Sequence, residues 1–323
     1  MDRRTASLAI AAALAPLAGP ARAQAPWPSR PVTMIMPYAA GGPTDLVARL
    51  LAQKMGDALG QPFLVANAPG GSTMVGAERA ARSAPDGHTL FIGSVTTFSN
   101  NPLMYRNIRY KVEDFVPIGM IARTPYTMTI APNVPARSYA EFVAFARQNP
   151  GKVFNATTGV GATNQLLGQM LAREAGIQLV DVPYKGAGPA LQDVMGGQVH
   201  LLFDGIKTSV PVHKSGKARV LAITSEKRSA ALPDVPTFAE LGLPNLTAAF
   251  WFALFAPAGT PPAVVEKLNA SLNAALGSSD IASRLTDDGL TFGAGTPQDV
   301  TETIRRDALV WGPVIKALNI QLD

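Results

Sequence analysis

Length, composition and charge narrow the possible functions before any motif is considered. The chain has 323 residues, of which 47% are hydrophobic and 16% charged, and its formal net charge is +5. This is enough chain for two ordinary domains, each with its own core. The absence of cysteine excludes a disulfide framework, a thiolate metal site and a cysteine nucleophile. The basic residues are scattered along the chain, which argues against nucleic-acid binding.

The first 23 residues are typical of a signal peptide. Arg3 and Arg4 precede an almost uncharged run over residues 6–18, and Ala21-Arg22-Ala23 closes the segment. A basic end, an apolar core and a small-residue site in this order favour cleavage after Ala23. The apolar run is shorter than the roughly 18 to 20 residues that span a bilayer. We therefore expect an exported, periplasmic protein.

The chain that follows alternates strands with helices. Residues 32–37 form a continuous apolar run of the kind that is buried on both faces of a sheet. Helical periodicity over residues 46–59 comes next, then short strands at 63–65 and 89–92 with a helix at 75–84 between them. This order predicts an α/β fold with a mostly parallel sheet covered by helices.

The same alternation resumes after Ser138 and predicts a second lobe. Helices are expected at residues 139–148 and 166–175, and strands at residues 153–155, 180–183, 199–203 and 220–224. A helical tail from residue 262 onward is expected to pack back on the first lobe.

Two extended apolar segments flank this second set. They cover residues 126–131 and 250–256, and each ends in Ala-Pro, which is typical of a strand that stops at a turn. We interpret them as crossovers between lobes. The first lobe then comprises residues 24–125 plus 246–323, and the second residues 126–245.

Loops rich in Gly, Ser and Thr follow strands at residues 39–45, 94–97, 157–164 and 184–188. In an open parallel sheet, ligands bind beyond the carboxyl ends of the strands, where such loops gather. Helix starts there present unpaired N–H groups and a partial positive charge, which suit a carboxylate. Any one of these loops alone is better explained as a tight turn with helix caps. Loops divided between two lobes favour a clamp around a small anion.

Enzymatic alternatives have little support. Residues 159–164 (GVGATN) begin like a dinucleotide fingerprint but lack its third glycine, and no Gly-Lys-Ser/Thr phosphate loop occurs. The histidines, His88, His200 and His213, have no metal-ligand spacing, and there is no Gly-x-Ser-x-Gly elbow. We expect no catalytic residue, no metal and no cofactor.

Several side chains have a functional and a structural interpretation. Asp45 either contacts a ligand or is a first-turn carboxylate favoured by the helix dipole. Lys185 can pair with an anion, although an exposed loop lysine is the commoner outcome. Asp204 can accept from an ammonium or hydroxyl group, or act as a cap. Phe98, Tyr38 and Trp251 can line a cleft, although large aromatic residues more often belong to a core.

Several stretches recur in the order and spacing of one known family. They are residues 27–31 (WPSRP), 37–45 (PYAAGGPTD), 84–90 (APDGHTL), 182–186 (VPYKG) with 189–191 (PAL), 196–199 (GGQV), 231–237 (ALPDVPT) and 255–261 (FAPAGTP). Across essentially its whole mature length the chain resembles the solute-binding proteins of tripartite tricarboxylate transporters, the Bug-type receptors. The resemblance implies a type II periplasmic-binding-protein fold whose two α/β lobes close on a small carboxylate, without catalysis. It also implies a monomer that delivers its ligand to the membrane subunits of a transporter. A periplasmic sensor that feeds a signalling partner, and a secreted hydrolase, are the alternatives.

The loops and the resemblance together predict a site between the lobes. From the first lobe we expect Tyr38, Ala40, Gly41, Gly42, Thr44, Asp45, Ser94, Thr96, Thr97 and Phe98. From the second lobe we expect Thr158, Gly159, Gly161, Ala162, Thr163, Asn164, Tyr184, Lys185, Gly186 and Asp204.

Departures from the family pattern fall in these loops. The family often has histidine where Phe98 and Gln165 stand, and arginine where Ala68 stands in the turn at residues 67–70. Losing these polar groups weakens the case for a highly charged ligand such as citrate. Our hypothesis is a less polar mono- or dicarboxylate, aromatic ones included, with Phe98 facing the ligand.

Overall fold

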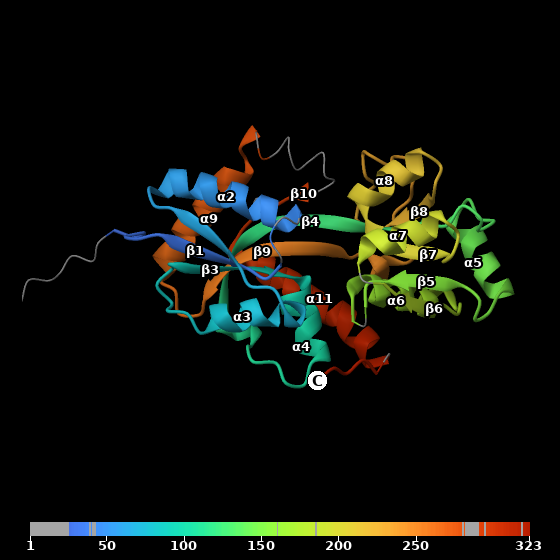
Figure 1. The fold of residues 1–323 in the computed structure, drawn as a ribbon, viewed down its shortest axis with the longest axis horizontal. Coiled ribbons are helices and arrows are strands. Elements are labelled where there is room, and N and C mark those ends of the chain that lie inside the picture. Colours follow the sequence, from blue (N-terminus) through green and yellow to red (C-terminus); the bar gives the residue numbers. More distant parts are fainter. Residues whose placement is uncertain are drawn as a thin grey trace, which may run out of the picture.

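The computed structural model describes residues 26–38, 40, 43–159, 161–184, 186–279, 281, 291–293, 295–317 and 319–323. The predicted signal peptide lies outside these residues, as do Gly41, Gly42 and Lys185 of the predicted site. Two lobes lie side by side along the long axis of the molecule (Figure 1). In the described ranges, no helix is both long and apolar enough to cross a bilayer.

The first lobe is built on a sheet with the strand order β2-β1-β3-β9-β4. Its strands are β1 (Val32–Met36), β2 (Phe63–Asn67), β3 (Thr89–Ser94), β9 (Ala249–Pro257), the first half of β4 (Phe115–Ile130) and the short β10 (Thr291–Phe292). The first three pair in parallel, whereas β9 and β4 run antiparallel to their neighbours. Most of β1 is buried, as its continuous apolar run predicts.

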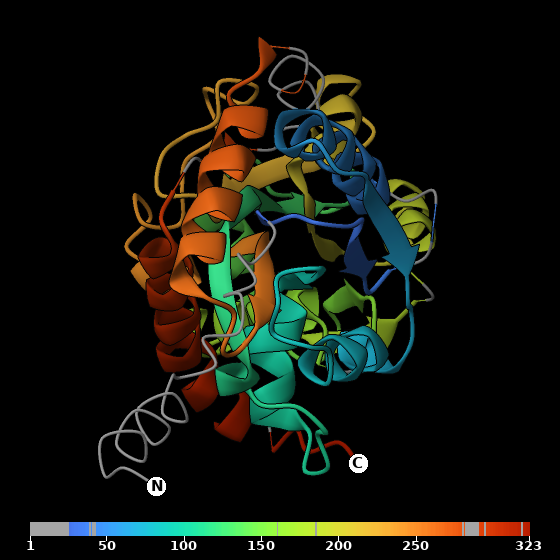
Figure 2. The ribbon, with the colours of Figure 1, turned by 90° about the vertical axis from the view of Figure 1, so that its left-hand side faces the viewer.

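Helices cover both faces of this sheet. They are α2 (Pro43–Leu59), α3 (Met74–Ala81), α9 (Pro262–Leu276) and the start of α11 (Pro297–Ala317). The apolar stripes of α2 and α9 share one core with strand residues such as Met34 and Leu254. On the opposite face, α3 and α11 close an aromatic core around Phe91 and Phe255. Figure 2, viewed from the first lobe, shows α2 and α9 toward the top and α3 and α11 toward the bottom.

The second lobe is built on the second half of β4. Its other strands are β5 (Phe154–Thr157), β6 (Val180–Pro183), β7 (Leu201–Gly205) and β8 (Arg219–Ile223). Its helices are α5 (Tyr139–Gln148), α6 (Thr163–Ala175), α7 (Ala187–Met195) and α8 (Ile206–Lys214). Local signals set their ends: the Ser138 side chain accepts from the Glu141 amide at the start of α5, and Gly176 ends α6 at φ 61°.

Two strand segments connect the lobes. β4 changes partner from β9 to β7 between Pro125 and Tyr126, without a break in the strand. The chain returns where the Ala248 amide donates to the Thr224 carbonyl at 3.0 Å, directly before β9. We call the two connecting segments, around Pro125–Tyr126 and around Ala248, the hinge. The division of the chain into lobes by residue number stays a prediction.

The C-terminal helix α11 also contacts both lobes. Val300, near its start, is buried in the aromatic core of the first lobe, whereas Trp311 and Val314 are buried in the core of the second. The sequence predicts a tail that packs on the first lobe; α9 does so, but the end of α11 packs on α6. Beyond α11, the Leu322 amide donates to the Met104 carbonyl at 2.8 Å, which returns the chain to the first lobe.

Candidate functional site

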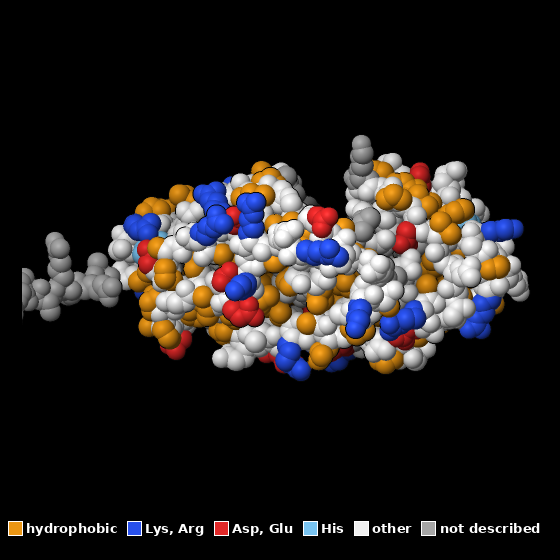
Figure 3. Space-filling view, turned by 90° about the horizontal axis from the view of Figure 1, so that it is seen from below, with side chains coloured by type: hydrophobic (Ala, Val, Ile, Leu, Met, Phe, Trp, Pro, Cys, Tyr) orange, Lys and Arg blue, Asp and Glu red, His pale blue; other side chains and the backbone are white. Residues whose placement is uncertain are grey.

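A cavity of about 460 Å³ lies where the two lobes face each other. Figure 3 shows the molecule hollowed between its lobes. The first lobe lines this inter-lobe cavity with Pro37, Tyr38, Pro69, Gly70, Ser72, Thr73, Thr96, Asn101, Met104, Tyr105 and Phe250, and the second with Tyr126, Thr158, Gly161, Ala162 and Thr163. Its volume is typical of small-molecule sites.

The wall from the first lobe is a connected set of hydroxyl and amide groups. Tyr38 Oη lies 2.8 Å from Ser94 Oγ, and Thr97 Oγ1 lies 2.8 Å from Thr73 Oγ1. Asn101 Nδ2 donates to the Ser72 carbonyl at 2.7 Å. A π-helical turn, η3 (Thr96–Asn100), carries part of this wall, and such turns occur frequently at functional sites. These bonds hold the wall in shape before any ligand arrives.

Asp45 organises the loop beside this wall. Its side chain is 3% exposed and accepts from Arg49 Nε at 2.9 Å and from Asn67 Nδ2 at 2.9 Å. Asn67 Nδ2 also lies 2.9 Å from the Tyr38 carbonyl. Asp45 therefore connects α2 to the end of β2 and, through Asn67, to the backbone of Tyr38, and it does not line the cavity.

The wall from the second lobe is the loop before α6. The Gly161 amide donates to Gln165 Oε1 at 2.8 Å, and the Thr158 amide donates to Asn164 Oδ1 at 3.3 Å. Two amides of the predicted anion-binding loop are thus already satisfied within the protein. The first N–H groups of α6, at Thr163 and Asn164, have no partner within their own helix. Gly161 shapes the wall, since its φ of 76° is favourable only for glycine.

Comparison with known proteins agrees with this geometry. Residues 47–320 match the profile of the tripartite tricarboxylate transporter family receptor. The chain belongs to this family. Protein BugT of Bordetella pertussis is 35% identical over 328 aligned residues, which cover 100% of this receptor and 99% of BugT.

Two solved structures are similar to this receptor in sequence and in fold. Rpa4515 of R. palustris, with adipate, is 36% identical with a TM-score of 0.77, over 90% of this receptor and 97% of that chain. MatC of Rhodopseudomonas palustris, with bound malate, is 34% identical with a TM-score of 0.74, over 90% and 100% of the two chains. The predicted family and two-lobed periplasmic-binding-protein fold are confirmed, and so is a receptor role in place of an enzymatic one.

The cavity brings together some of the predicted residues of the receptor. They are Tyr38, Thr96, Thr158, Gly161, Ala162 and Thr163. Predicted residues that do not line it are Ala40, Thr44, Asp45, Ser94, Thr97, Phe98, Gly159, Asn164, Tyr184, Gly186 and Asp204. Of these, Tyr184 donates to Asp193 at 2.7 Å, and Asp204, buried enough to raise the pKa of its carboxyl, accepts from Thr208 at 2.6 Å.

Phe98 lies in the aromatic core and not at the cavity. Its side chain is 2% exposed and stacks on Phe255 with 4.0 Å between ring centroids, edge-on to Phe115 at 5.1 Å. The ring lies over Gly93, where a Cβ would come within 2.1 Å of Phe98 Cε2. The hypothesis that Phe98 faces the ligand is therefore corrected, because a missing side chain on β3 makes room for the ring inside the lobe.

Sequence reasoning missed other cavity residues. The loop Gly70-Gly71-Ser72-Thr73 follows β2 and has the same composition as the loops that we selected, so it was detectable. Tyr126 and Phe250 lie at the two crossovers, which border any cleft between lobes.

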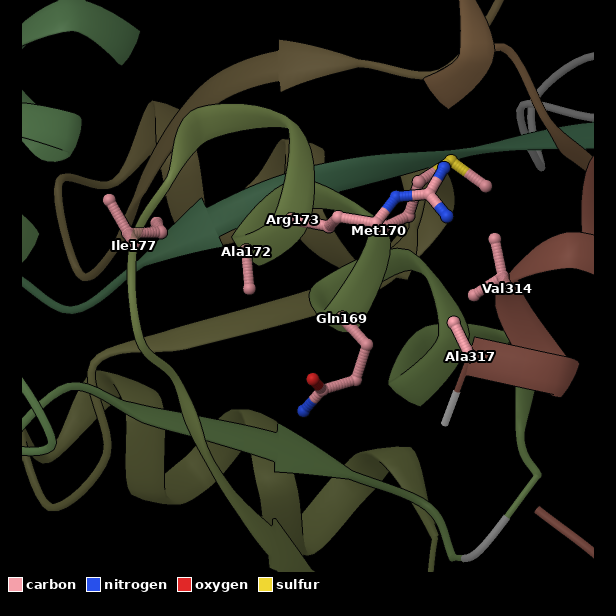
Figure 4. A pocket seen from close by; sticks show the side chains of 7 residues that line it. All are labelled: Gln169, Met170, Ala172, Arg173, Ile177, Val314 and Ala317. Atoms are coloured by element: carbon pink, nitrogen blue, oxygen red, sulfur yellow. The ribbon is translucent and has the colours of Figure 1, made fainter. Parts of the chain in front are cut away.

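A further pocket of about 260 Å³ lies between α6 and α11, lined by residues such as Met170 and Val314 (Figure 4), and holds none of the predicted residues.

No described residue that lines the inter-lobe cavity carries a formal charge. Burial raises the pKa of Tyr38, although hydrogen bonds to Ser94 and Thr96 oppose the shift. Burial also raises the pKa of Tyr126, opposed by a hydrogen bond to Thr163. Both phenols thus stay protonated at neutral pH and can donate. In the described ranges, no three His, Asp or Glu side chains form a group that could hold a metal ion.

Asp307 of α11 anchors the π-helical turn through its side chain. It accepts from Ser99 Oγ at 2.9 Å and from Trp251 Nε1 at 2.7 Å, and burial raises the pKa of its carboxyl. Because the folded state then holds this proton to higher pH than the unfolded state, the contribution of this carboxyl to wild-type stability falls as pH rises from about 4 through the raised pKa. Asp307→Asn lacks this dependence, so its stability relative to the wild type should rise across that window. Urea unfolding of both proteins between pH 3 and 7 measures the difference.

Asp299, at the start of the same helix, is the matched control. The Thr296 backbone and side-chain hydrogen bonds lower the pKa of its carboxyl, so its contribution is lost as pH falls through the lowered pKa. Asp299→Asn should therefore lose stability relative to the wild type as pH rises. If the Asp307→Asn and wild-type stabilities changed in parallel with pH, the buried carboxyl would have no raised pKa.

Proposed function

We propose that this receptor captures a small mono- or dicarboxylate in its inter-lobe cavity and delivers it to the membrane subunits of a tripartite tricarboxylate-type transporter. The observation that carries the proposal is the lining: hydroxyl groups and the start of α6 face a space bounded by Tyr38, Tyr126 and Phe250. Neutral donors and a helix start suit one or two carboxylates. The bound adipate of Rpa4515 and malate of MatC support this class of ligand.

The lining also argues against a highly charged ligand. Each hydrogen bond to a carboxylate contributes about 1.5 to 3 kcal/mol, which a neutral wall can supply for a small number of oxygens. A third carboxylate would be buried without a cationic partner among the described lining residues, and burying an unpaired charge is costly. We therefore place citrate below adipate, malate and aromatic carboxylates in affinity.

Capture is proposed to occur by rotation of the lobes at the hinge. The ligand would bind one wall and then draw the other wall onto it, so that closure is driven by contacts that exist only in the closed form. We further propose that the chain acts in the periplasm as a monomer, after cleavage near Ala23.

Native mass spectrometry of the receptor recovered from the periplasm tests these statements together. We expect a monomer whose mass lacks the first 23 residues and that carries a small carboxylate. A thermal-shift screen should then show larger increases in Tm for adipate, malate and phthalate than for citrate. A larger increase for citrate would contradict the proposed ligand class, and ester or amide turnover by the purified protein would contradict the receptor role.

A further inference from the structure

A second cavity, of about 540 Å³, lies behind the hinge. Successive residues of the two hinge strands face opposite sides: Pro125 and Ala249 line this back pocket, whereas Tyr126 and Phe250 line the inter-lobe cavity. The two cavities are therefore back to back on the same strands. The other residues that line the back pocket are Arg123, Ile206, residues 224–231, Thr247, Ala248 and Arg306.

The charge of the back pocket is mostly positive. Arg123, Lys227, Arg228 and Arg306 line it, with Glu226 as the single described carboxylate in its lining. Arg306 pairs with Glu226 at 3.1 Å. Arg228 pairs with Glu240, which lies outside the lining, at 3.0 Å. The lining residues thus leave a surplus of positive charge.

Arg123 is a lining cation that has no directly paired carboxylate among the described residues. It is half-buried, and its guanidinium donates to the neutral Thr303 hydroxyl at 2.6 Å. No carboxylate of the described residues lies within 4.0 Å of it. Burial and the neighbouring Arg306 lower the pKa of Arg123, and the more distant charges of Asp307, Glu226 and Asp299 oppose the shift. An anion in the pocket would supply a directly paired counter-ion.

Part of the remaining lining is apolar, beside the hydroxyl groups of Thr224, Ser225, Ser229 and Thr247. Pro125, Ile206 and Ala248 give the pocket a hydrophobic side, and the volume exceeds that of the inter-lobe cavity. We propose that the back pocket is a second binding site, for a small organic anion whose charge lies against Arg123 and Arg306 and whose apolar body lies against the hinge strands.

Occupation of this site has a consequence for capture. Rotation that closes the inter-lobe cavity changes the spacing between Arg306 and the loop of residues 224–231, because both cavities share the hinge strands. Ligands in the two cavities therefore alter each other's affinity by the same factor. The second site is then regulatory, and this step rests on the proposed closure.

Alanine methyl groups line each cavity, and the Arg123→Gln variant distinguishes binding at the back pocket from shifts that closure transmits to it. Ala230, Ala231, Ala248 and Ala249 line the back pocket, and Ala162 lines the inter-lobe cavity. We would titrate the receptor, labelled with ¹³C at alanine methyls, with phthalate, with inorganic phosphate, and with sodium chloride at equal ionic strength. We expect phthalate to shift the back-pocket methyls saturably, and phosphate to bind them less tightly.

Arg123→Gln should weaken phthalate binding at the back-pocket methyls by about tenfold or more, the effect of losing one charge-assisted contact. Arg305→Gln is the matched control, because Arg305 is an exposed residue of α11 that pairs with Glu302 and lines neither cavity. Shifts confined to Ala162, equal affinity in Arg123→Gln, equal binding of phosphate, or the same shifts with sodium chloride would each overturn the proposal. The Ala162 signal reports independently on the proposed function.

Discussion

Replacing Gly161 with leucine is expected to abolish carboxylate binding while the receptor still folds. Gly161 has a φ of 76°, and a Cβ there would lie 2.6 Å from Met104 Sδ. The Met104 side chain can move aside, but the left-handed backbone costs a residue with a side chain about 1 to 2 kcal/mol. Relief of that strain moves the loop whose Gly161 amide bonds to Gln165, and the leucine side chain enters the cavity. We expect at least a roughly 100-fold loss of affinity, which corresponds to about 2.7 kcal/mol.

Isothermal titration with the carboxylate found by native mass spectrometry measures this loss, and circular dichroism checks the fold. Gly312→Leu is the control, because Gly312 of α11 has open space where its Cβ would be and lies outside the cavity. It should bind with wild-type affinity. Equal affinity in Gly161→Leu and the wild type would mean that this loop is not part of the site.

Phe98→Ala is expected to lower the free energy of unfolding by about 3 to 5 kcal/mol, as is usual for a buried phenylalanine. The ring contacts Phe91, Phe115 and Phe255, so its removal leaves a cavity in the aromatic core of the first lobe. The order of ligand affinities should stay as in the wild type, because the ring does not line the cavity. Urea unfolding and the same ligand screen give the two measurements.

Phe145→Ala, on α5, provides the comparison. Phe145 is only partly buried against the core of the second lobe, so its truncation should cost clearly less than that of Phe98. A Phe98→Ala variant with wild-type stability and a changed preference among carboxylates would restore the interpretation that this ring faces the ligand.

Hydrophobic patterns in the sequence predicted the positions of β1 and of most of α2. The apolar run at residues 32–37 became β1, and helical periodicity at residues 46–59 lies within α2. The segment at residues 126–131 was expected to be a strand on its own, whereas it is the second half of β4. Pro117, Gly119 and Pro125 interrupt the pattern before it, and pairing with β9 keeps the strand continuous across them. Such pairing joins residues far apart in sequence and leaves no local signal.

The sequence predicted which loops form the site, but not which of their residues and atoms face the cavity. Composition and position after a strand selected the loop that carries Thr158, Gly161 and Thr163, all of which line the cavity. The same reasoning assigned the Gly161 amide to the ligand, yet Gln165 already accepts from it. It also could not foresee that Gly93 leaves room for the Phe98 ring. Both outcomes depend on tertiary neighbours that a turn's composition does not specify.

Pro125 stands where β4 leaves one sheet for the other, and proline has no amide hydrogen. The ladder therefore has one fewer cross-strand bond at the point where the proposed rotation is centred. Bending there breaks no amide hydrogen bond from this residue, so a change of opening angle costs less enthalpy at Pro125 than at a residue with an N–H group. The contacts that the ligand makes then determine which opening angle is most populated, and a weakly bound ligand would leave the receptor partly open.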